Sequence, residues 1–415
     1  FQEASTYTCI VDLTKTKKDK VHFKKITPEE LFKYSSFDQM SYDLLSEQNW
    51  DLQGENTFNL IEKLSSQPFV VGDVFNNIFQ GIATSLDSVY VFKGIDKGEF
   101  IEGYNEKFDY VFQIEKDIVK PFLKGNEVSR YANPNIKHYV IFPYRDDSKT
   151  PIPIKEDYIK QKLPKTYSYL KHFEKEIKSR ERGRMNINEN WYLYIYPKSL
   201  DKFSNPKIMT QEISLGCNMT YDANGTVYHP TTVYSFVKNP EFEVDEKYYL
   251  GILNSKIMWF FLKNTGTELA GGYFRFKTNY LKPFPLPGIS NNSKIIIDKV
   301  NLQLDQNKSF QNISSKFTNY IQSQFTIDKL TKKLQNWHEL EFGDFIKELN
   351  KAIKKSGGEK LSKMDEMDWL EVFETKKEEA LKLKAEIHKT DKEIDQMVYE
   401  LYGLTDEEIQ IVENS

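Results

Sequence analysis

The fold of this chain is decided near its C-terminus, where residues 394–409 read IDQMVYELYGLTDEEI. Apolar side chains recur there at helical spacing and form one stripe, made of Ile394, Met397, Val398, Leu401 and Tyr402. Gly403 stands where a glycine commonly ends a helix, and Thr405 with Glu408 has the spacing of a capping box. The stretch therefore predicts a helix, a stop and a second, short helix, and the stripe predicts helix–helix core.

Other segments carry a family resemblance in a fixed order along the chain. They read FQEASTYTCIVDL at 1–13, FQGIAT at 79–84 with VYVF at 89–92, KPFLKGNEV at 120–128, LNSK at 253–256, and GYFRFK at 272–277 leading to PFPLP at 283–287. With 394–409 they resemble type IIG restriction–modification enzymes and their relatives. In that family an adenine methyltransferase is followed by a TaqI-like target-recognition region. The resemblance extends over nearly the whole chain.

The resemblance implies an α+β fold with three parts. Residues 1–65 would be the end of the methyltransferase domain and a connecting segment. Residues 66–290 would be a β-rich target-recognition domain with inserted helices, and residues 291–415 a C-terminal helical bundle. The chain starts at Phe1 and reads as if it began within a sheet. We therefore expect a fragment whose catalytic domain lies upstream.

Composition describes a protein without membrane spans or disulfides. Among 415 residues the hydrophobic content is 39%, and no apolar run approaches the roughly 20 residues of a membrane helix. Two cysteines, Cys9 and Cys217, cannot build a disulfide framework or a four-cysteine zinc site. The six histidines have no ligand spacing, so no metal site is expected. We expect a cytoplasmic protein with no membrane partner.

The net charge of −4 conceals an asymmetry. Residues 365–415 contain 16 acidic and 6 basic side chains, a net charge of −10, which leaves +6 for the other 364 residues. Phosphate contact requires a local basic face rather than a basic protein. Composition thus permits DNA binding outside the acidic C-terminal segment.

Periodicity predicts a β-rich first part. We expect a strand at 6–14 and a helix starting at Thr27, which forms a capping box with Glu30. Short aromatic and β-branched runs from 69 to 237 predict twisted antiparallel sheet. Within it, residues 165–180 predict a helix, and Asn224-Gly225 predicts a hairpin turn.

The second part is predicted to be helical. The expected helices cover 246–262, 294–322, 328–354 and 365–402. Prolines at 283, 285 and 287 predict a stiff linker without regular structure. Asn254 and Ser255 are interpreted as packing or capping residues.

The sequence lacks the motifs of a methyltransferase active site. Such a site needs a glycine-rich turn and an Asn/Asp-Pro-Pro-aromatic tetrapeptide, which grips the amine of a flipped adenine. Asn133-Pro134, Asn205-Pro206 and Asn239-Pro240 all lack the second proline. The family resemblance then assigns S-adenosylmethionine to the upstream domain, and Mg²⁺ to a nuclease domain if one is fused there. We expect this fragment to be catalytically silent.

The first candidate for DNA contact is residues 171–184. Its cations are Lys171, Lys175 and Lys178 on one helical face, followed by Arg180, Arg182 and Arg184. Arginines on a flexible edge suit a bidentate grip on guanine or phosphate. The alternative is a solvated helix with an ordinary Glu174–Lys178 surface pair.

The second candidate is residues 271–280. Strand alternation places Tyr273, Arg275 and Lys277 on one face and Phe274 and Phe276 on the other. The first face could meet a DNA strand, which the preceding glycines would allow to approach closely. The alternative is an amphipathic strand with exposed cations. The two phenylalanines are predicted to be core in either case.

The third candidate is the loop 80–85, where Gln80 and Thr84 could face DNA. A glutamine amide can read adenine with two hydrogen bonds. A purely structural turn is the alternative. The matching family segment often reads Gly-Ile-x-Thr-Gly, and here Ser85 replaces the final glycine.

Together these features predict the sequence-specific DNA-recognition part of a bacterial adenine methyltransferase, whose partners are double-stranded DNA and the upstream domain of the same chain. Side chains would hold phosphates and read base edges in the major groove. A protein–protein scaffold of a phage-defence complex is the alternative. A nuclease acting by itself is disfavoured, because no metal-binding carboxylate pair with a nearby lysine stands out.

Overall fold

The computed structural model describes residues 54–145, 151–290 and 292–415, together with part of 10–42. It is 46% helical and 19% strand, with sheets in the first part and a helical region in the second, which confirms the expected α+β class. Near the N-terminus, β1 (Lys20–Phe23) and β2 (Asp38–Ser41) form an antiparallel pair. Most of the strand expected at 6–14 and of the helix expected from Thr27 lies outside the described residues.

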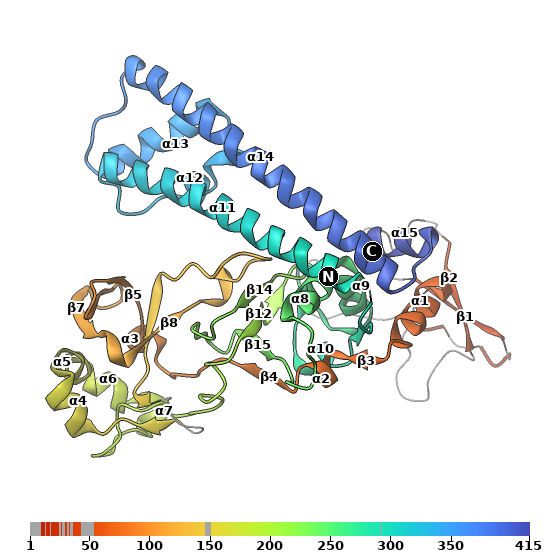
Figure 1. The fold of residues 1–415 in the computed structure, drawn as a ribbon, viewed down its shortest axis with the longest axis horizontal. Coiled ribbons are helices and arrows are strands. Elements are labelled where there is room, and N and C mark those ends of the chain that lie inside the picture. Colours follow the sequence, from red (N-terminus) through yellow and green to blue (C-terminus); the bar gives the residue numbers. More distant parts are fainter. Residues whose placement is uncertain are drawn as a thin grey trace.

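Two antiparallel sheets dominate the first part (Figure 1). The five-stranded sheet has the order β7-β6-β5-β9-β8: Tyr110–Glu115, Phe100–Asn105, Val91–Asp96, His138–Ile141 and Val119–Phe122. The four-stranded sheet has the order β14-β12-β15-β4: Met219–Asp222, Lys207–Gln211, Val233–Val237 and Asn77–Gln80. A bridge between Phe122 and Tyr228 joins the two sheets. The predicted antiparallel sheet is therefore present, divided into two.

The turn at Asn224-Gly225 is not the hairpin that the sequence predicts. Gly225 has a positive φ of 63°, but Asn224 does not. The strand before the turn, β14, pairs with β12, and the next strand, β15, pairs with the other edge of β12. Long-range pairing with β12 therefore separates the two strands that a hairpin would have joined.

Three predicted helices are broken. The helix expected at 328–354 is divided into α12 (Lys332–Gln335), the 3₁₀ turn η5 (Trp337–Glu339) and α13 (Phe342–Lys355), because Asn336 and Leu340 leave helical backbone angles. The helix expected at 165–180 consists of α5 (Pro164–His172), α6 (Glu174–Lys178) and α7 (Arg180–Gly183). The helix expected at 246–262 consists of α8 (Glu246–Asn254) and α9 (Lys256–Thr265). Ser255 has extended backbone angles between them, and its hydroxyl accepts the Met258 N–H, so it ends one helix by capping the next.

The proline-rich segment is not a free linker. Its residues Pro285–Leu286 form β18, which pairs with β3 (Phe69–Val70). Pro285 and Leu286 are both buried. The missing proline N–H does not prevent the pairing, because a two-stranded edge pairing needs few donors. The segment is therefore part of the main core.

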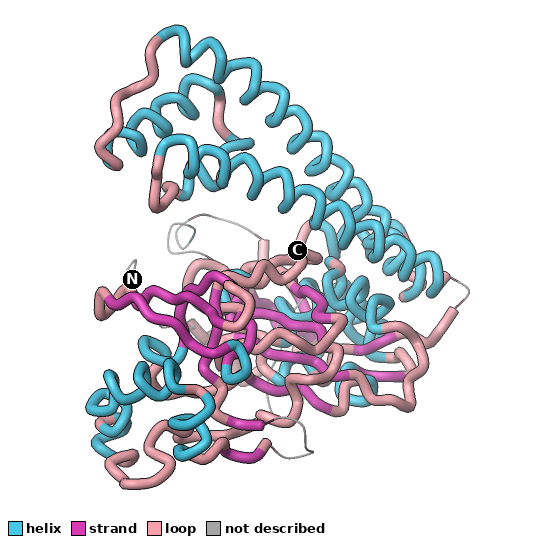
Figure 2. The backbone as a smooth tube through the Cα atoms, turned by 60° about the vertical axis from the view of Figure 1, so that its left-hand side comes forward, coloured by secondary structure: helices cyan, strands magenta, loops and turns pink. Residues whose placement is uncertain are grey.

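A long helical hairpin follows, which we call the arm. It is built from α11 (Ser293–Phe325) and α14 (Lys363–Leu401), with α12 (Lys332–Gln335) and α13 (Phe342–Lys355) between them. Ile296 of α11 and Ile394 of α14 belong to the main core. Far from that base, α11 and α14 share a separate apolar cluster with α13. The two long helices thus run antiparallel and carry the tip away from the sheets (Figures 1 and 2).

The stretch 394–409 folds as its pattern predicts. Gly403 has a positive φ of 62°, and Thr405 and Glu408 form the reciprocal capping box that begins α15 (Asp406–Glu413). Ile394 and Val398 are fully buried against α8 and α9. Leu401 is only partly buried at the edge of this core, which corrects the expectation that it is a core residue.

Candidate nucleic-acid interface

A groove of about 800 Å³ lies where the two sheets meet. One wall comes from β5, the end of β6 and the short helix α3 (Asp87–Tyr90). The other comes from the end of β12 and the loop 230–232 before β15, and the 3₁₀ turn η4 (Gly125–Glu127) also borders the groove. The groove therefore joins segments that are far apart in the sequence.

The lining combines cations with hydrogen-bonding side chains. Lys93, Lys107 and Lys124 are exposed on it, and Lys93 is 3.4 Å from Glu106. The neutral polar members are Asn105, Asn126, Gln211, Thr231 and Thr232. Amides and hydroxyls can read base edges, and lysines contact phosphates. Three carboxylates, Asp87, Glu106 and Glu212, also line the groove. The lining is therefore polar and mixed in charge, which suits a ligand with hydrogen-bonding edges and phosphates near the lysines better than an apolar ligand.

Gln80 is the predicted residue that lies beside this groove. It is exposed at the end of β4, and its Nε2 donates to the carbonyl oxygen of Thr231 at 3.0 Å. Next to it, Gly81 packs against His229, where an added Cβ would lie 1.9 Å from the carbonyl oxygen. Burial lowers the pKa of His229 to about 3, so the ring is neutral when it meets Ser235 Oγ at 2.6 Å. The close packing of Gly81 against His229 thus holds Gln80 at the groove.

Thr84 supports the groove from behind and does not face it. It is 1% exposed, and its Oγ1 donates to Asp87 Oδ1 at 2.5 Å and accepts the Leu86 N–H at 3.0 Å. Asp87 itself lines the groove. The structural alternative therefore describes Thr84 in this structure, whereas Gln80 keeps an exposed amide.

Arg180 is likewise a support. It is 4% exposed, and its guanidinium donates to the carbonyl oxygens of Ile177, Thr84, Trp191 and Leu193 at 2.8–3.0 Å. The helix break turns it inward, because Glu181 and Arg182 adopt positive φ directly after it. The prediction that Arg180 contacts DNA does not fit this burial, since all four carbonyls would lose their donor.

The other cations of the 171–184 segment remain at the surface. Lys171 and Lys178 both pair with Glu174, at 2.9 and 2.7 Å, as the solvated-helix alternative expected. Among the described residues Lys175 has no ion-pair partner. Arg182 and Arg184 are exposed beyond the helix break, and Arg184 lies over the Tyr196 ring. Arg184 also lies 3.6 Å from Glu181 and donates to the Tyr196 hydroxyl at 3.4 Å, both through Nη1, so its other guanidinium nitrogens and the exposed Arg182 are the groups available to a phosphate.

The second candidate segment lies at the other end of the groove. Strand β17 (Tyr273–Arg275) pairs with β13 (Ile213–Ser214), and Arg275 Nη1 is 3.4 Å from Glu212, which lines the groove. Tyr273 is 44% exposed, Arg275 and Lys277 are half-buried, and Phe274 and Phe276 are buried as predicted. Gln80 and β17 therefore border the groove through Thr231 and Glu212, which line it. Helix α7 contacts the Thr84 loop through Arg180.

The sequence interpretation missed the groove lysines. Lys93 and Lys107 stand in ordinary strand and turn contexts, which carry no motif. Lys124 and Asn126 belong to the segment 120–128 that carries the family resemblance, and this was the available signal.

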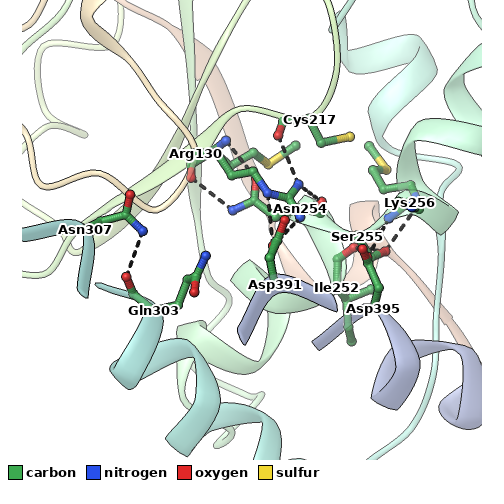
Figure 3. A network of polar contacts seen from close by, with 12 residues as sticks. Arg130, Cys217, Ile252, Asn254, Ser255, Lys256, Gln303, Asn307, Asp391 and Asp395 are labelled. Atoms are coloured by element: carbon green, nitrogen blue, oxygen red, sulfur yellow. Dashed lines mark hydrogen bonds and ion pairs between the residues drawn. The ribbon is translucent and has the colours of Figure 1, made fainter. Parts of the chain in front are cut away.

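A polar network fixes the arm to the first part of the chain (Figure 3). Arg130 donates to Asp391 of α14 at 2.6 Å and to the carbonyl oxygens of Asn254 and Cys217. Asp395 accepts the Lys256 N–H at 2.9 Å, which caps α9 from α14. Burial raises the pKa of Asp395 to about 6. Asn254 and Ser255 serve as packing and capping residues here, as predicted.

Two absences concern the described part of the chain alone. There, no group of three or more His, Cys, Asp or Glu side chains could hold a metal ion. No helix in those segments is long and apolar enough to cross a bilayer.

Comparison with known families confirms the resemblance. Residues 120–286 match the TaqI-like C-terminal specificity domain, and residues 289–398 match a domain of unknown function, DUF8810. No curated protein matches the chain. Among solved structures, the type IIG restriction endonuclease BpuSI matches with 11% identity and a TM-score of 0.37. That match covers 88% of this chain, which spans 36% of the BpuSI chain.

Proposed function

We propose that this chain is the DNA-recognition part of a restriction–modification enzyme and that duplex DNA binds along the groove. The observation that carries the proposal is that Lys93, Lys107 and Lys124 surround one groove together with the exposed amide of Asn126. The groove residues from Lys124 onward belong to the segment 120–286, which matches a specificity domain. Lysines neutralise phosphates and set the register, whereas amides read base edges. The match to the family model supports this assignment independently of the groove.

Individual roles follow from position. Asn126 and Gln211 line the groove, and Gln80 lies beside it. The amide groups of these three side chains are assigned to base edges. Tyr273 and Arg275 extend the surface at one end, and Arg182 with Arg184 reaches phosphates beyond the Thr84 loop. Thr84 and Arg180 keep that loop in place.

The finer proposal concerns the complete enzyme. The complete enzyme is proposed to be an adenine-specific DNA methyltransferase. Its upstream domain would bind S-adenosylmethionine, and a fused nuclease domain would require Mg²⁺. No residue of this chain is assigned to the methyl donor. The 415-residue chain alone should transfer no labelled methyl group from S-adenosylmethionine to DNA, and transfer by the purified chain would contradict this division of labour.

The test is salt-dependent binding to duplex DNA of random sequence. In the variant Lys93→Gln/Lys107→Gln/Lys124→Gln, loss of three phosphate contacts should lower the salt slope by about 2.7, since each contact contributes roughly 0.9. The matched control, Lys382→Gln/Lys389→Gln/Lys392→Gln, removes the same charge from exposed positions of α14. If both variants are folded and have the same salt slope, the groove does not contact DNA.

One observation favours the scaffold function instead. Met364 and Met367 of α14 are 74% and 70% exposed, and large exposed apolar side chains suit protein contact. Absence of salt-dependent DNA binding by the wild-type chain, together with a partner captured through these residues, would favour that function.

A further inference from the structure

The outer half of the arm does not brace the recognition sheets. Ile296 and Val300 of α11 and Ile394 and Val398 of α14 fasten its base to the main core. The outer half closes a separate core, whose largest members are Phe317, Trp337, Phe345, Trp369 and Phe373. Attachment to the main core requires only the base of the arm, so the outer half of α11 and α14 must be explained by another role.

That length is considerable. From Ile394 at the base to Lys363 at the tip, α14 spans 31 residues, roughly 46 Å at 1.5 Å per residue. At 3.4 Å per base pair this corresponds to roughly 13 base pairs of duplex DNA. Both views show the arm rising away from the sheets (Figures 1 and 2). In Figure 1 its tip lies above the end of the molecule that holds β5, β7 and β8 of the five-stranded sheet.

The tip carries a lysine cluster, which we define as Lys347, Lys351, Lys354 and Lys355 of α13 with Lys360 of the next loop. All five are exposed, and none has an ion-pair partner among the residues that the structure describes. Lys347, Lys351 and Lys355 follow one another at intervals of four positions, and Lys354 lies three positions after Lys351, so the four side chains lie on one side of the helix. The opposite face, with Phe345, Leu349 and Ile353, is buried in the arm core.

The charge of the tip is asymmetric. Residues 345–363 contain six lysines and two glutamates, a net charge of +4. Residues 364–379, at the start of α14, contain seven acidic and two basic side chains, a net charge of −5. A polyanion is attracted by the α13 face and repelled by the start of α14, so the tip selects one orientation.

We propose that the lysine cluster of α13 is a second DNA-contacting surface, which holds the phosphate backbone of a duplex that extends beyond the groove toward the tip of the arm. This inference rests on the proposed function, because the groove must hold the same duplex. The contact is independent of sequence, since lysines on an exposed helix face meet phosphates as point charges. It assigns a role to the segment that matches a domain of unknown function.

The experiment compares duplexes of 12 and 40 base pairs, both of random sequence, by fluorescence anisotropy over a salt series. The tip variant is Lys351→Gln/Lys354→Gln/Lys355→Gln, and the control is Lys382→Gln/Lys389→Gln/Lys392→Gln, with folding checked by circular dichroism. The tip variant should lose at least about tenfold in affinity for the 40-base-pair duplex, with a salt slope lower by roughly 2–3. Its affinity for the 12-base-pair duplex should equal that of the wild type.

The outcomes separate the two proposals. If the wild type binds both duplexes but the tip variant behaves like the control, the tip contact is wrong and the groove stands. A tip variant that weakens both duplexes equally also overturns it, because a short duplex in the groove should not reach the tip. If the wild type binds neither duplex in a salt-dependent manner, the proposed function fails and the tip contact fails with it.

Discussion

Arg180 Nη1 donates a hydrogen bond to the carbonyl oxygen of Thr84 at 2.8 Å, across 96 residues of sequence. Thr84 in turn binds Asp87 through its hydroxyl, and Asp87 lines the groove. The buried guanidinium of Arg180 donates only to backbone carbonyl oxygens, so it holds the Thr84 loop in place and does not face a ligand. Two residues that resemble DNA contacts in the sequence are therefore the internal support of the recognition surface.

Replacing Arg180 with alanine should destabilise the fold. Four buried carbonyl oxygens lose their donor, and each unsatisfied group costs about 1–3 kcal/mol, so we expect a loss of at least about 3 kcal/mol in the free energy of unfolding. Urea denaturation measures it. The neighbouring Arg182→Ala is the control, since an exposed side chain should change stability by less than about 0.5 kcal/mol. Similar stability changes in both variants would contradict the assigned difference.

Arg182 and Arg184 should affect DNA binding rather than stability. Replacing both with glutamine removes two exposed cations beyond the helix break, and the salt slope of duplex binding should fall by roughly 2. Anisotropy titrations at several salt concentrations measure the slope. An unchanged slope in a folded double variant would leave these arginines as ordinary surface, which is the alternative that the sequence left open.

Ser85→Gly should stabilise the protein. Ser85 has a positive φ of 58°, where a side chain costs about 1–2 kcal/mol, and glycine loses part of that gain to chain entropy. The expected net gain is about 0.5 kcal/mol in thermal or urea unfolding. Gly81→Ala, four residues earlier, should be strongly destabilising because its Cβ would meet the His229 carbonyl at 1.9 Å. A destabilised Ser85→Gly protein would show that the serine side chain makes a needed contact.

Truncations in the C-terminal stripe should separate stability from recognition. Ile394 is fully buried, so Ile394→Ala should cost about 2–5 kcal/mol, whereas the partly buried Leu401 should cost less. The preferred DNA sequence should survive in both variants, because base contacts are assigned to the groove. Binding-site selection at a temperature where all proteins are folded tests this. A changed preference would mean that the acidic helices take part in reading DNA.

Asp395 should make the arm base sensitive to pH. Burial raises the pKa of Asp395 from an ordinary value of 3.8 to about 6, so the folded state binds the proton more tightly than the unfolded state. Its contribution to stability is present below pH 3.8 and is lost as the pH rises through 6. Asp395→Asn keeps an acceptor for the Lys256 N–H and should stabilise the protein by about 1–3 kcal/mol at pH 7.5. Unfolding curves at pH 5 and 7.5 should show a smaller pH difference for this variant than for the wild type.

Local patterns were sufficient for much of the fold. The capping glycine Gly403, the capping box of Thr405 with Glu408, and the inward Phe274 and Phe276 all form as the sequence predicts. Each depends on hydrogen bonds or alternation within a few residues, which the sequence order specifies directly. The sequence order does not show where a segment with helical periodicity is interrupted. At Ser255 the interruption occurs because the serine side chain caps the following helix, α9.

The sequence by itself determined the α+β class, the two long helices of the arm and the family resemblance, because these depend on periodicity and on short segments in order. Only the tertiary structure decided which cations face outward. The groove joins Lys93, Lys107 and Lys124 with Thr231, although these residues lie up to 138 positions apart in the chain. Strand pairing between distant segments creates that surface, and Arg180 is buried beside the helix break at Glu181 and Arg182. The groove and the burial of Arg180 both result from contacts between residues far apart in the sequence, and local sequence patterns do not identify such partners.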